Sequence, residues 1–90
     1  MQEEVTALVT QRLRPLEPSE VAERESDITG ALGLLWDQHV AHGDVALRNL
    51  VVDNAGAVRL IDFGDARRCG SRDEAKAVDS PYLAGLFARA

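Results

Sequence analysis

Two short apolar runs separated by a turn constrain the fold of this chain more than any other feature. The runs are 50–52 (Leu-Val-Val) and 58–61 (Val-Arg-Leu-Ile). Between them lies the segment 53–57 (Asp-Asn-Ala-Gly-Ala), and Asn, Asp and Gly tolerate the backbone angles that turns need. The spacing predicts an antiparallel hairpin in which Leu50 lies near Ile61 and Asn49 lies near Asp62.

This hairpin would bring hard oxygen donors together at its open end. Mg²⁺ is typically held by one or two carboxylates together with phosphate oxygens and water. Phosphoryl transfer needs such a metal, and a carboxylate that orients the attacking hydroxyl and accepts its proton. Asn49 and Asp62 are therefore candidate metal ligands, and Asp44, one short loop upstream, is a candidate base. His42 is expected to hydrogen-bond the backbone and fix the loop.

The composition excludes several classes of protein. Ninety residues fit one small domain with a thin core, and the net charge of −5 argues against a nucleic-acid-binding protein. A single cysteine, Cys69, rules out an internal disulfide and most cysteine-based zinc sites. No apolar run is long enough to span a membrane, and the acidic start of the chain lacks the features of a secretory signal. The expected location is the cytoplasm.

The apolar periodicity predicts helices on both sides of the hairpin. The first covers residues 2–14 and ends before Pro15 and Pro18. The second covers residues 19–40, with Ser19 as its N-cap. Its apolar stripe is Val21, Ala22, Ile28, Ala31, Leu32, Leu35 and Trp36. A helical tail covers residues 71–89, divided into a short helix to about Val78 and a last helix capped by Ser80, with Pro81 at its first position. The fold class is α+β.

Two motifs in order resemble a known superfamily. His42-Gly43-Asp44 with Asn49 five residues after the aspartate, followed by Ile61-Asp62-Phe63-Gly64, resembles the catalytic loop and metal-binding DFG turn of protein-kinase-like phosphotransferases. The HGD form is more similar to the aminoglycoside phosphotransferase group and other atypical kinases than to regulated protein kinases. The resemblance covers about residues 19–67 and implies part of a kinase-like C-lobe, mainly helical, with one β-hairpin.

The resemblance also implies roles for individual residues. Asp44 matches the catalytic base, and Asn49 and Asp62 match the Mg²⁺ ligands. His42 matches the structural histidine of the loop, and Gly64 matches the glycine that lets the next segment turn. The implied cofactors are ATP and Mg²⁺.

Three departures from the family pattern stand beside these matches. Ala46 lies where protein kinases have a lysine that touches the transferred phosphate, so Arg48 is the candidate nucleotide-binding residue in its place. Asp65 lies where an apolar residue is common. No glycine-rich loop or lysine-bearing strand precedes the hairpin, and the chain has one lysine, Lys76. These departures predict a truncated C-lobe without its N-lobe.

Two functions remain open at this point. One is an ATP- and Mg²⁺-dependent phosphotransferase fragment, weak or inactive in isolation, that acts on an unknown phosphoacceptor. The other is a non-catalytic remnant that binds a protein or a nucleotide. The thin core further suggests self-association or a partner chain that supplies the missing lobe.

Overall fold

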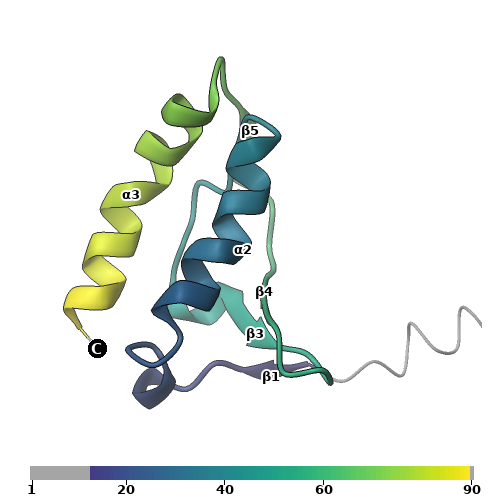
Figure 1. The fold of residues 1–90 in the computed structure, drawn as a ribbon, viewed down its shortest axis with the longest axis vertical. Helices are drawn as coiled ribbons and strands as arrows, with labels where there is room; N and C mark the ends of the chain where they lie inside the picture. Colours follow the sequence, from purple (N-terminus) through teal and green to yellow (C-terminus); the bar gives the residue numbers. More distant parts are fainter. Residues whose placement is uncertain (1–12, 90) are drawn as a thin grey trace, which may run out of the picture.

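Two long helices that pack side by side form the frame of the molecule. The computed structural model describes residues 13–89. Helix α2 (Glu25–Asp37) and helix α3 (Arg72–Ala88) run antiparallel (Figure 1). An ion pair, from Arg72 Nε to Asp37 Oδ1 at 2.7 Å, joins the start of α3 to the end of α2. With the strands described next, these helices confirm the mixed α+β class.

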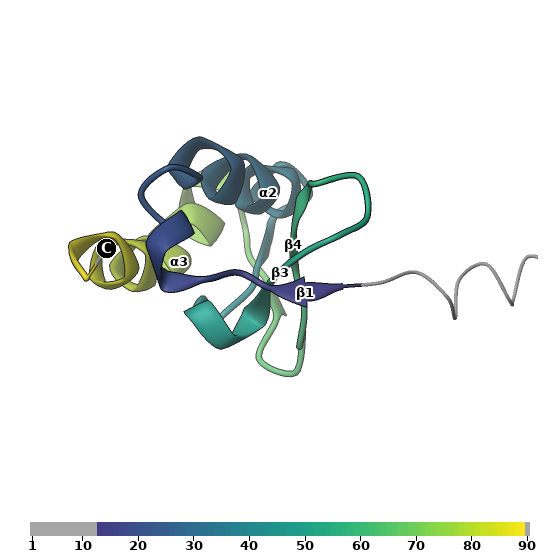
Figure 2. The same ribbon diagram turned by 90° about the horizontal axis from the view of Figure 1, so that it is seen from below.

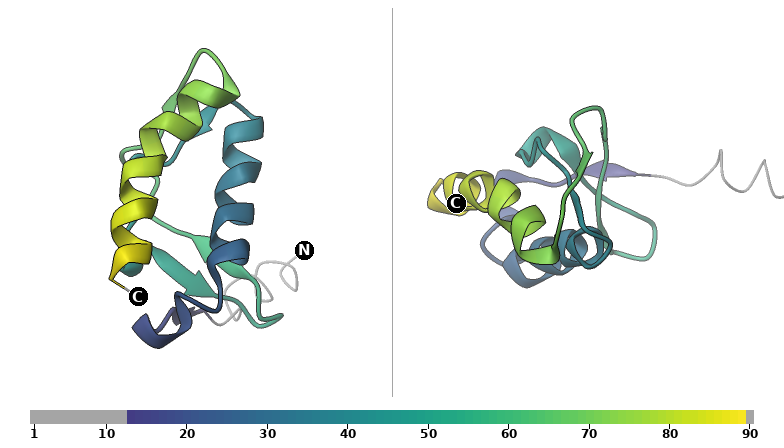
Figure 3. Two further views of the ribbon diagram at one scale, coloured as in Figure 1. Left: turned by 60° about the vertical axis from the view of Figure 1, so that its left-hand side comes forward. Right: turned by 90° about the horizontal axis from the view of Figure 1, so that it is seen from above.

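Five short strands in the described residues form two small antiparallel sheets. The larger sheet has the order β1-β3-β4, made of β1 (Arg14–Pro15), β3 (Leu50–Val52) and β4 (Val58–Leu60). Figure 2 shows its strands side by side, and Figure 3 places them at the end of the helix pair where α2 begins and α3 ends. The smaller sheet pairs β2 (Val40–Ala41) with β5 (Arg67–Arg68). Two 3₁₀ turns, η1 (Pro18–Glu20) and η2 (Leu47–Asn49), complete the fold.

The core lies between the two helices and the larger sheet. It is built from aliphatic side chains around Trp36, which is 2% exposed. Its largest fully buried apolar members come from α2 and β3: Ile28, Leu32 and Leu50. Of the stripe predicted for the second helix, Ala22 is exposed, as is His39, which continues the same spacing. Neither helix of residues 13–89 has the length and apolar character needed to cross a membrane.

The hairpin forms as predicted, but its register differs by one residue. Leu50 pairs with Leu60 rather than with Ile61. The loop closes through a backbone hydrogen bond from Asp53 N to Ala57 O, and Gly56 adopts a left-handed φ of 83°. This register keeps Arg59 opposite Val51 on the outer face of the sheet. The expected register would have placed Arg59 opposite Val52, on the core face, because side chains alternate along a strand.

The predicted helix over residues 19–40 is too long at both ends. Ser19 lies inside η1, where a capping box joins Glu17 and Glu20 instead, and α2 begins only at Glu25. The turns between η1 and α2 bury Val21. At the other end, His39 has a left-handed φ of 60°, which stops the helix and directs the chain into β2.

The two ends of the chain also depart from expectation. Most of the helix predicted over residues 2–14 lies outside the described residues, but Arg14 belongs to β1, where it pairs with Val52. The tail is one continuous helix over Arg72–Ala88, capped by Ser71, whose Oγ accepts from Glu74 N at 3.1 Å. Pro81 lies inside this helix, and Ser80 donates its hydroxyl to Lys76 O rather than acting as a cap. The helix continues past Pro81 because Asp79 and Leu83, on either side of it, are buried on one face of the helix.

Candidate functional site

The loop that joins β2 to η2 is held from inside by His42, which is fully buried. Its Nδ1 accepts a hydrogen bond from Asp44 N at 3.2 Å, and its Nε2 lies 2.9 Å from Ile61 O. Because Nδ1 is the acceptor, Nε2 carries the proton and donates to the carbonyl. One imidazole thus joins the loop that carries Asp44 to the segment that carries Asp62.

A carboxylate from α3 holds the same loop from the opposite side. Asp79 is fully buried and accepts three hydrogen bonds at 2.9 Å each, from Trp36 Nε1, His42 N and Gly43 N. Asp79 is not among the residues predicted from the sequence. The signal was available, because Asp79 lies four residues from both Ala75 and Leu83, the other buried positions of α3.

Asp44 and Asn49 are brought together at the end of this loop. Asn49 is buried, and its Nδ2 donates to Asp44 O at 2.8 Å and to Asp44 Oδ2 at 3.1 Å. Arg48 Nη2 lies 2.8 Å from Asp44 Oδ1 and 2.7 Å from Oδ2, so a single guanidinium nitrogen contacts both carboxylate oxygens. The Arg48 side chain is 68% exposed. It is therefore free to leave Asp44 without disturbing the core.

Asp62 enters the site from the other strand of the hairpin. Its neighbour Ile61 donates its N–H to Asn49 O at 2.9 Å, which places the start of the Asp62 turn beside Asn49. Asp62 is exposed and has a φ of 60°. A left-handed backbone is strained for a residue with a side chain, and such strain concentrates at functional sites. Asp62 Oδ1 accepts from Gly64 N at 3.3 Å, which tightens the turn.

The position between His42 and Asp44 can be occupied only by glycine. The φ of Gly43 is 85°, and a Cβ at this position would collide with the backbone oxygen of Asp65. Both the backbone angle and the space therefore require glycine. The contact also places Asp65 directly against the loop that carries Asp44.

The exposed ring of Phe63 packs against the buried imidazole. The centroids of the His42 and Phe63 rings are 5.1 Å apart, in an edge-on arrangement. Phe63 is 49% exposed, and Ile61 beside it is 37% exposed. The segment 61–65 is thus held by backbone contacts on one side and is open to solvent on the other.

The side-chain oxygens of Asn49 and Asp62 fit a hard divalent cation whose other ligands are phosphate oxygens and water. Within residues 13–89, no group of three or more His, Cys, Asp or Glu side chains is placed to hold a metal. The hydrogen bonds of the Asn49 side chain among these residues use its amide nitrogen, so its amide oxygen is available. One carboxylate and one amide oxygen match Mg²⁺, which takes few protein ligands when phosphate oxygens and water supply the rest.

Comparisons with known proteins point in the same direction. The model of the family described as protein tyrosine and serine/threonine kinase matches residues 2–83. A putative serine/threonine-protein kinase of Saccharomyces cerevisiae is 35% identical over 57 residues, which cover 63% of this chain. Serine/threonine-protein kinase ppk31 of Schizosaccharomyces pombe is 35% identical over 54 residues, or 60% of the chain. Cyclin-dependent kinase 11 of Dictyostelium discoideum is 33% identical over 58 residues, or 64%.

The matched segments form a small part of these relatives. They cover 6%, 5% and 16% of the three proteins, respectively. No solved structure matches the chain significantly.

Proposed function

Because the chain belongs to the protein tyrosine and serine/threonine kinase family, we propose that residues 42–64 form the catalytic loop and metal-binding turn of an ATP-dependent phosphotransferase. The observation that carries this proposal is the position of Asn49. Its side chain contacts Asp44, and its backbone oxygen accepts from Ile61 N next to Asp62. One residue thus joins the candidate base to the candidate metal ligand.

Asp44 acts as the base in this proposal. The oxygen of an acceptor hydroxyl forms a bond to the γ-phosphorus of ATP, the bond from that phosphorus to the bridging oxygen breaks, and ADP leaves. The hydroxyl proton passes to a carboxylate oxygen of Asp44. The hydrogen bond from Asn49 Nδ2 orients this carboxylate beforehand, and the bond from Asp44 N to the buried imidazole of His42 fixes the backbone that carries it.

Asn49 and Asp62 would hold the Mg²⁺ ion through their side-chain oxygens. When bound, the ion neutralises phosphate charge. The left-handed backbone of Asp62 supports this role, because the fold maintains an unfavourable φ at an exposed residue that carries a carboxylate.

Arg48 is the phosphate-binding residue in this proposal, in place of the lysine that Ala46 replaces. Its Nη2 contacts both oxygens of Asp44. A bound triphosphate would compete for the guanidinium and release Asp44 to accept a proton. The exposure of the Arg48 side chain supports such a movement.

The finer placement in the aminoglycoside phosphotransferase group is also part of the proposal. It is supported by Gly43, whose φ and close approach to Asp65 exclude the arginine of the HRD form.

A non-catalytic nucleotide-binding or protein-binding module is the second candidate function. The observation that favours it is the contact between Arg48 and Asp44, which occupies both oxygens of the base. Under this alternative, the nucleotide binds with Mg²⁺ but no phosphate is transferred.

Binding of a fluorescent ATP analogue with and without Mg²⁺ tests the metal site. We expect Mg²⁺-dependent binding to the wild type and at least a tenfold loss in Asp62→Asn. The matched control is Asp73→Asn, which removes an exposed carboxylate at the start of α3. Binding that is unchanged in Asp62→Asn would refute the metal-site assignment.

Turnover then separates the two candidate functions. Release of ADP that disappears in Asp44→Asn, while Mg²⁺-dependent binding persists, identifies a phosphotransferase. Binding without turnover in the wild type identifies the non-catalytic module.

A further inference from the structure

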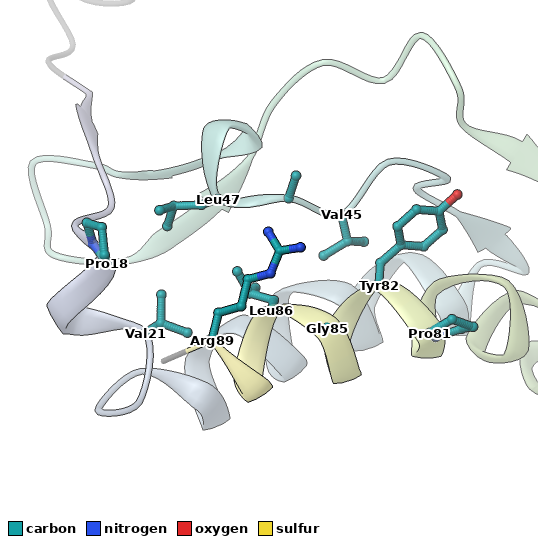
Figure 4. A pocket seen from close by; sticks show the side chains of 10 residues that line it. Pro18, Val21, Val45, Leu47, Pro81, Tyr82, Gly85, Leu86 and Arg89 are labelled. Atoms are coloured by element: carbon teal, nitrogen blue, oxygen red, sulfur yellow. The ribbon is translucent and has the colours of Figure 1, made fainter.

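A pocket of about 390 Å³ lies between the candidate catalytic loop, η1 and the second half of α3 (Figure 4). Its walls are mostly apolar, and they come from three segments that are distant in the sequence. The lining residues that matter here are Val45 and Ala46 from the loop, Val21 near η1, and Tyr82, Gly85 and Arg89 from α3. The volume is typical of a site for a small molecule.

Arg89 gives this pocket a chemical preference. It is the one charged residue among the described residues that line it. Figure 4 shows its side chain extending from the end of α3 toward the segment that carries Val45 and Leu47. Within residues 13–89, the Arg89 side chain makes no ion pair or hydrogen bond, whereas Arg14, Arg24, Arg48, Arg59 and Arg72 each pair with a carboxylate. A guanidinium at an apolar wall favours a ligand that combines an apolar body with an anionic group.

The pocket is also next to the candidate base. Val45 and Ala46, which form part of its wall, directly follow Asp44 in the chain. Consecutive Cα atoms are about 3.8 Å apart, so the wall of the pocket adjoins the residue that carries the candidate base. Asp44 does not itself line the pocket, so a ligand held by Arg89 must be long enough to pass Val45 and Ala46 before its other end reaches the Asp44 carboxylate.

We propose that this pocket binds the phosphoacceptor, a small molecule with an apolar body, an anionic group that pairs with Arg89 and a hydroxyl that reaches Asp44. This inference rests on the proposed phosphotransferase function and adds a substrate class to it. The transferred phosphoryl group comes from ATP, and the hydroxyl proton passes to Asp44 as above.

The test uses 8-hydroxyoctanoate as the probe, with octane-1,8-diol as its uncharged counterpart. Titration calorimetry without nucleotide should show binding of the acid to the wild type and at least tenfold weaker binding of the diol. Arg89→Gln should weaken binding of the acid at least tenfold and leave binding of the diol unchanged. Arg68→Gln is the matched control, since it removes an exposed arginine of β5 away from the pocket.

A second variant blocks the pocket without destabilising the fold. A Cβ on Gly85 would meet no atom within 4 Å, and leucine favours a helix more than glycine does. Gly85→Leu should therefore fill the pocket and abolish binding of the acid while the melting temperature stays the same or rises. Retained binding in Gly85→Leu, or binding of the acid that is equal in the wild type and Arg89→Gln, would overturn the proposal.

A final measurement separates this inference from the proposed function. With Mg²⁺ and ATP, mass spectrometry should detect the phosphate ester of 8-hydroxyoctanoate, and the ester should be absent with Asp44→Asn. If Mg²⁺-dependent ATP binding is intact and 8-hydroxyoctanoate does not bind, the substrate class is wrong and the phosphotransferase proposal stands. If the acid binds through Arg89 but ATP does not bind, the acceptor assignment fails together with the proposed function.

Discussion

The two segments that meet at the candidate site are held in very different ways. The loop 42–49 has a fully buried histidine and donates hydrogen bonds on two sides: the His42 ring donates to Ile61 O, and the backbone N–H groups of His42 and Gly43 donate to the Asp79 carboxylate. The segment 61–65 is exposed along its whole length and is fixed mainly by backbone contacts of Ile61 and by the approach of Asp65 to Gly43.

This difference separates stability from ligand binding. In the loop that carries Asp44, the buried polar groups are hydrogen-bonded. Substitutions there should therefore lower the free energy of unfolding. In the segment that carries Asp62, few contacts depend on the side chains. Substitutions there should therefore affect nucleotide binding more than stability. The following substitutions test this division, from the largest expected effect to the smallest.

Asp79→Ala should have the largest effect on stability. It leaves two backbone N–H groups and the Trp36 indole N–H buried without an acceptor, which should cost about 3–5 kcal/mol. Chemical denaturation monitored by Trp36 fluorescence measures this loss. Asp73→Ala, which removes an exposed carboxylate of the same helix, should change stability by less than about 0.5 kcal/mol. Similar losses in both variants would contradict the role of Asp79.

Gly43→Ala and Gly56→Ala compare two glycines with nearly the same backbone angle. Their φ values are 85° and 83°, but a Cβ on Gly43 would collide with Asp65 O, whereas a Cβ on Gly56 meets no atom within 4 Å. Gly56→Ala should cost about 1–2 kcal/mol from backbone strain alone. Gly43→Ala should cost more, and the difference between their denaturation midpoints measures the steric contact between the two segments.

Asp62→Gly and His39→Gly compare two non-glycine residues with the same φ of 60°. Each change should relieve left-handed strain and raise the free energy of unfolding by up to about 1 kcal/mol. Asp62→Gly should also abolish Mg²⁺-dependent nucleotide binding, whereas His39→Gly should leave it unchanged. If neither variant is more stable, the backbone strain is smaller than the dihedral angles indicate.

Acidification should weaken the turn that joins the two segments. Hydrogen bonding from Arg59, helped by the backbone N–H groups of Ala57 and Ala55, holds the pKa of Asp53 below its ordinary value. A carboxyl with a lowered pKa in the folded state stabilises the protein above its unfolded pKa of about 4, and this stabilisation is lost as the pH falls through the folded pKa. Denaturation midpoints measured below pH 4 should therefore fall less steeply in Asp53→Asn than in the wild type. Glu25→Gln, which changes an exposed glutamate at the start of α2, is the control.

Local features of the fold could be predicted from the sequence, and distant ones could not. The hairpin and the approach of Asn49 to the Asp62 turn depend on about a dozen consecutive residues with clear turn chemistry. The register was wrong by one residue because the position of Arg59 on the outer face was not used. The spacing of Asp79 from Ala75 and Leu83 indicates a buried position, but its partners, Trp36 and His42, are 43 and 37 residues away, and helical periodicity does not identify them.

The helix boundaries were less predictable for a related reason. Ser19-Glu20 and Ser80-Pro81 both have the residues of a helix start, yet the first lies within η1 and the second within α3. Packing of Val21 and Leu83 against the core decided both cases, and tertiary contacts routinely override local propensity.

The anchoring of the loop by Asp79 also has a consequence for the order of folding. Its hydrogen bonds close chain segments of 36 to 43 residues, and contacts so distant in sequence form slowly compared with a hairpin. During synthesis, the loop that carries Asp44 cannot reach its final shape until residue 79 has left the ribosome. The hairpin can form earlier, so the turn that carries Asp62 should be in place before the loop that carries Asp44.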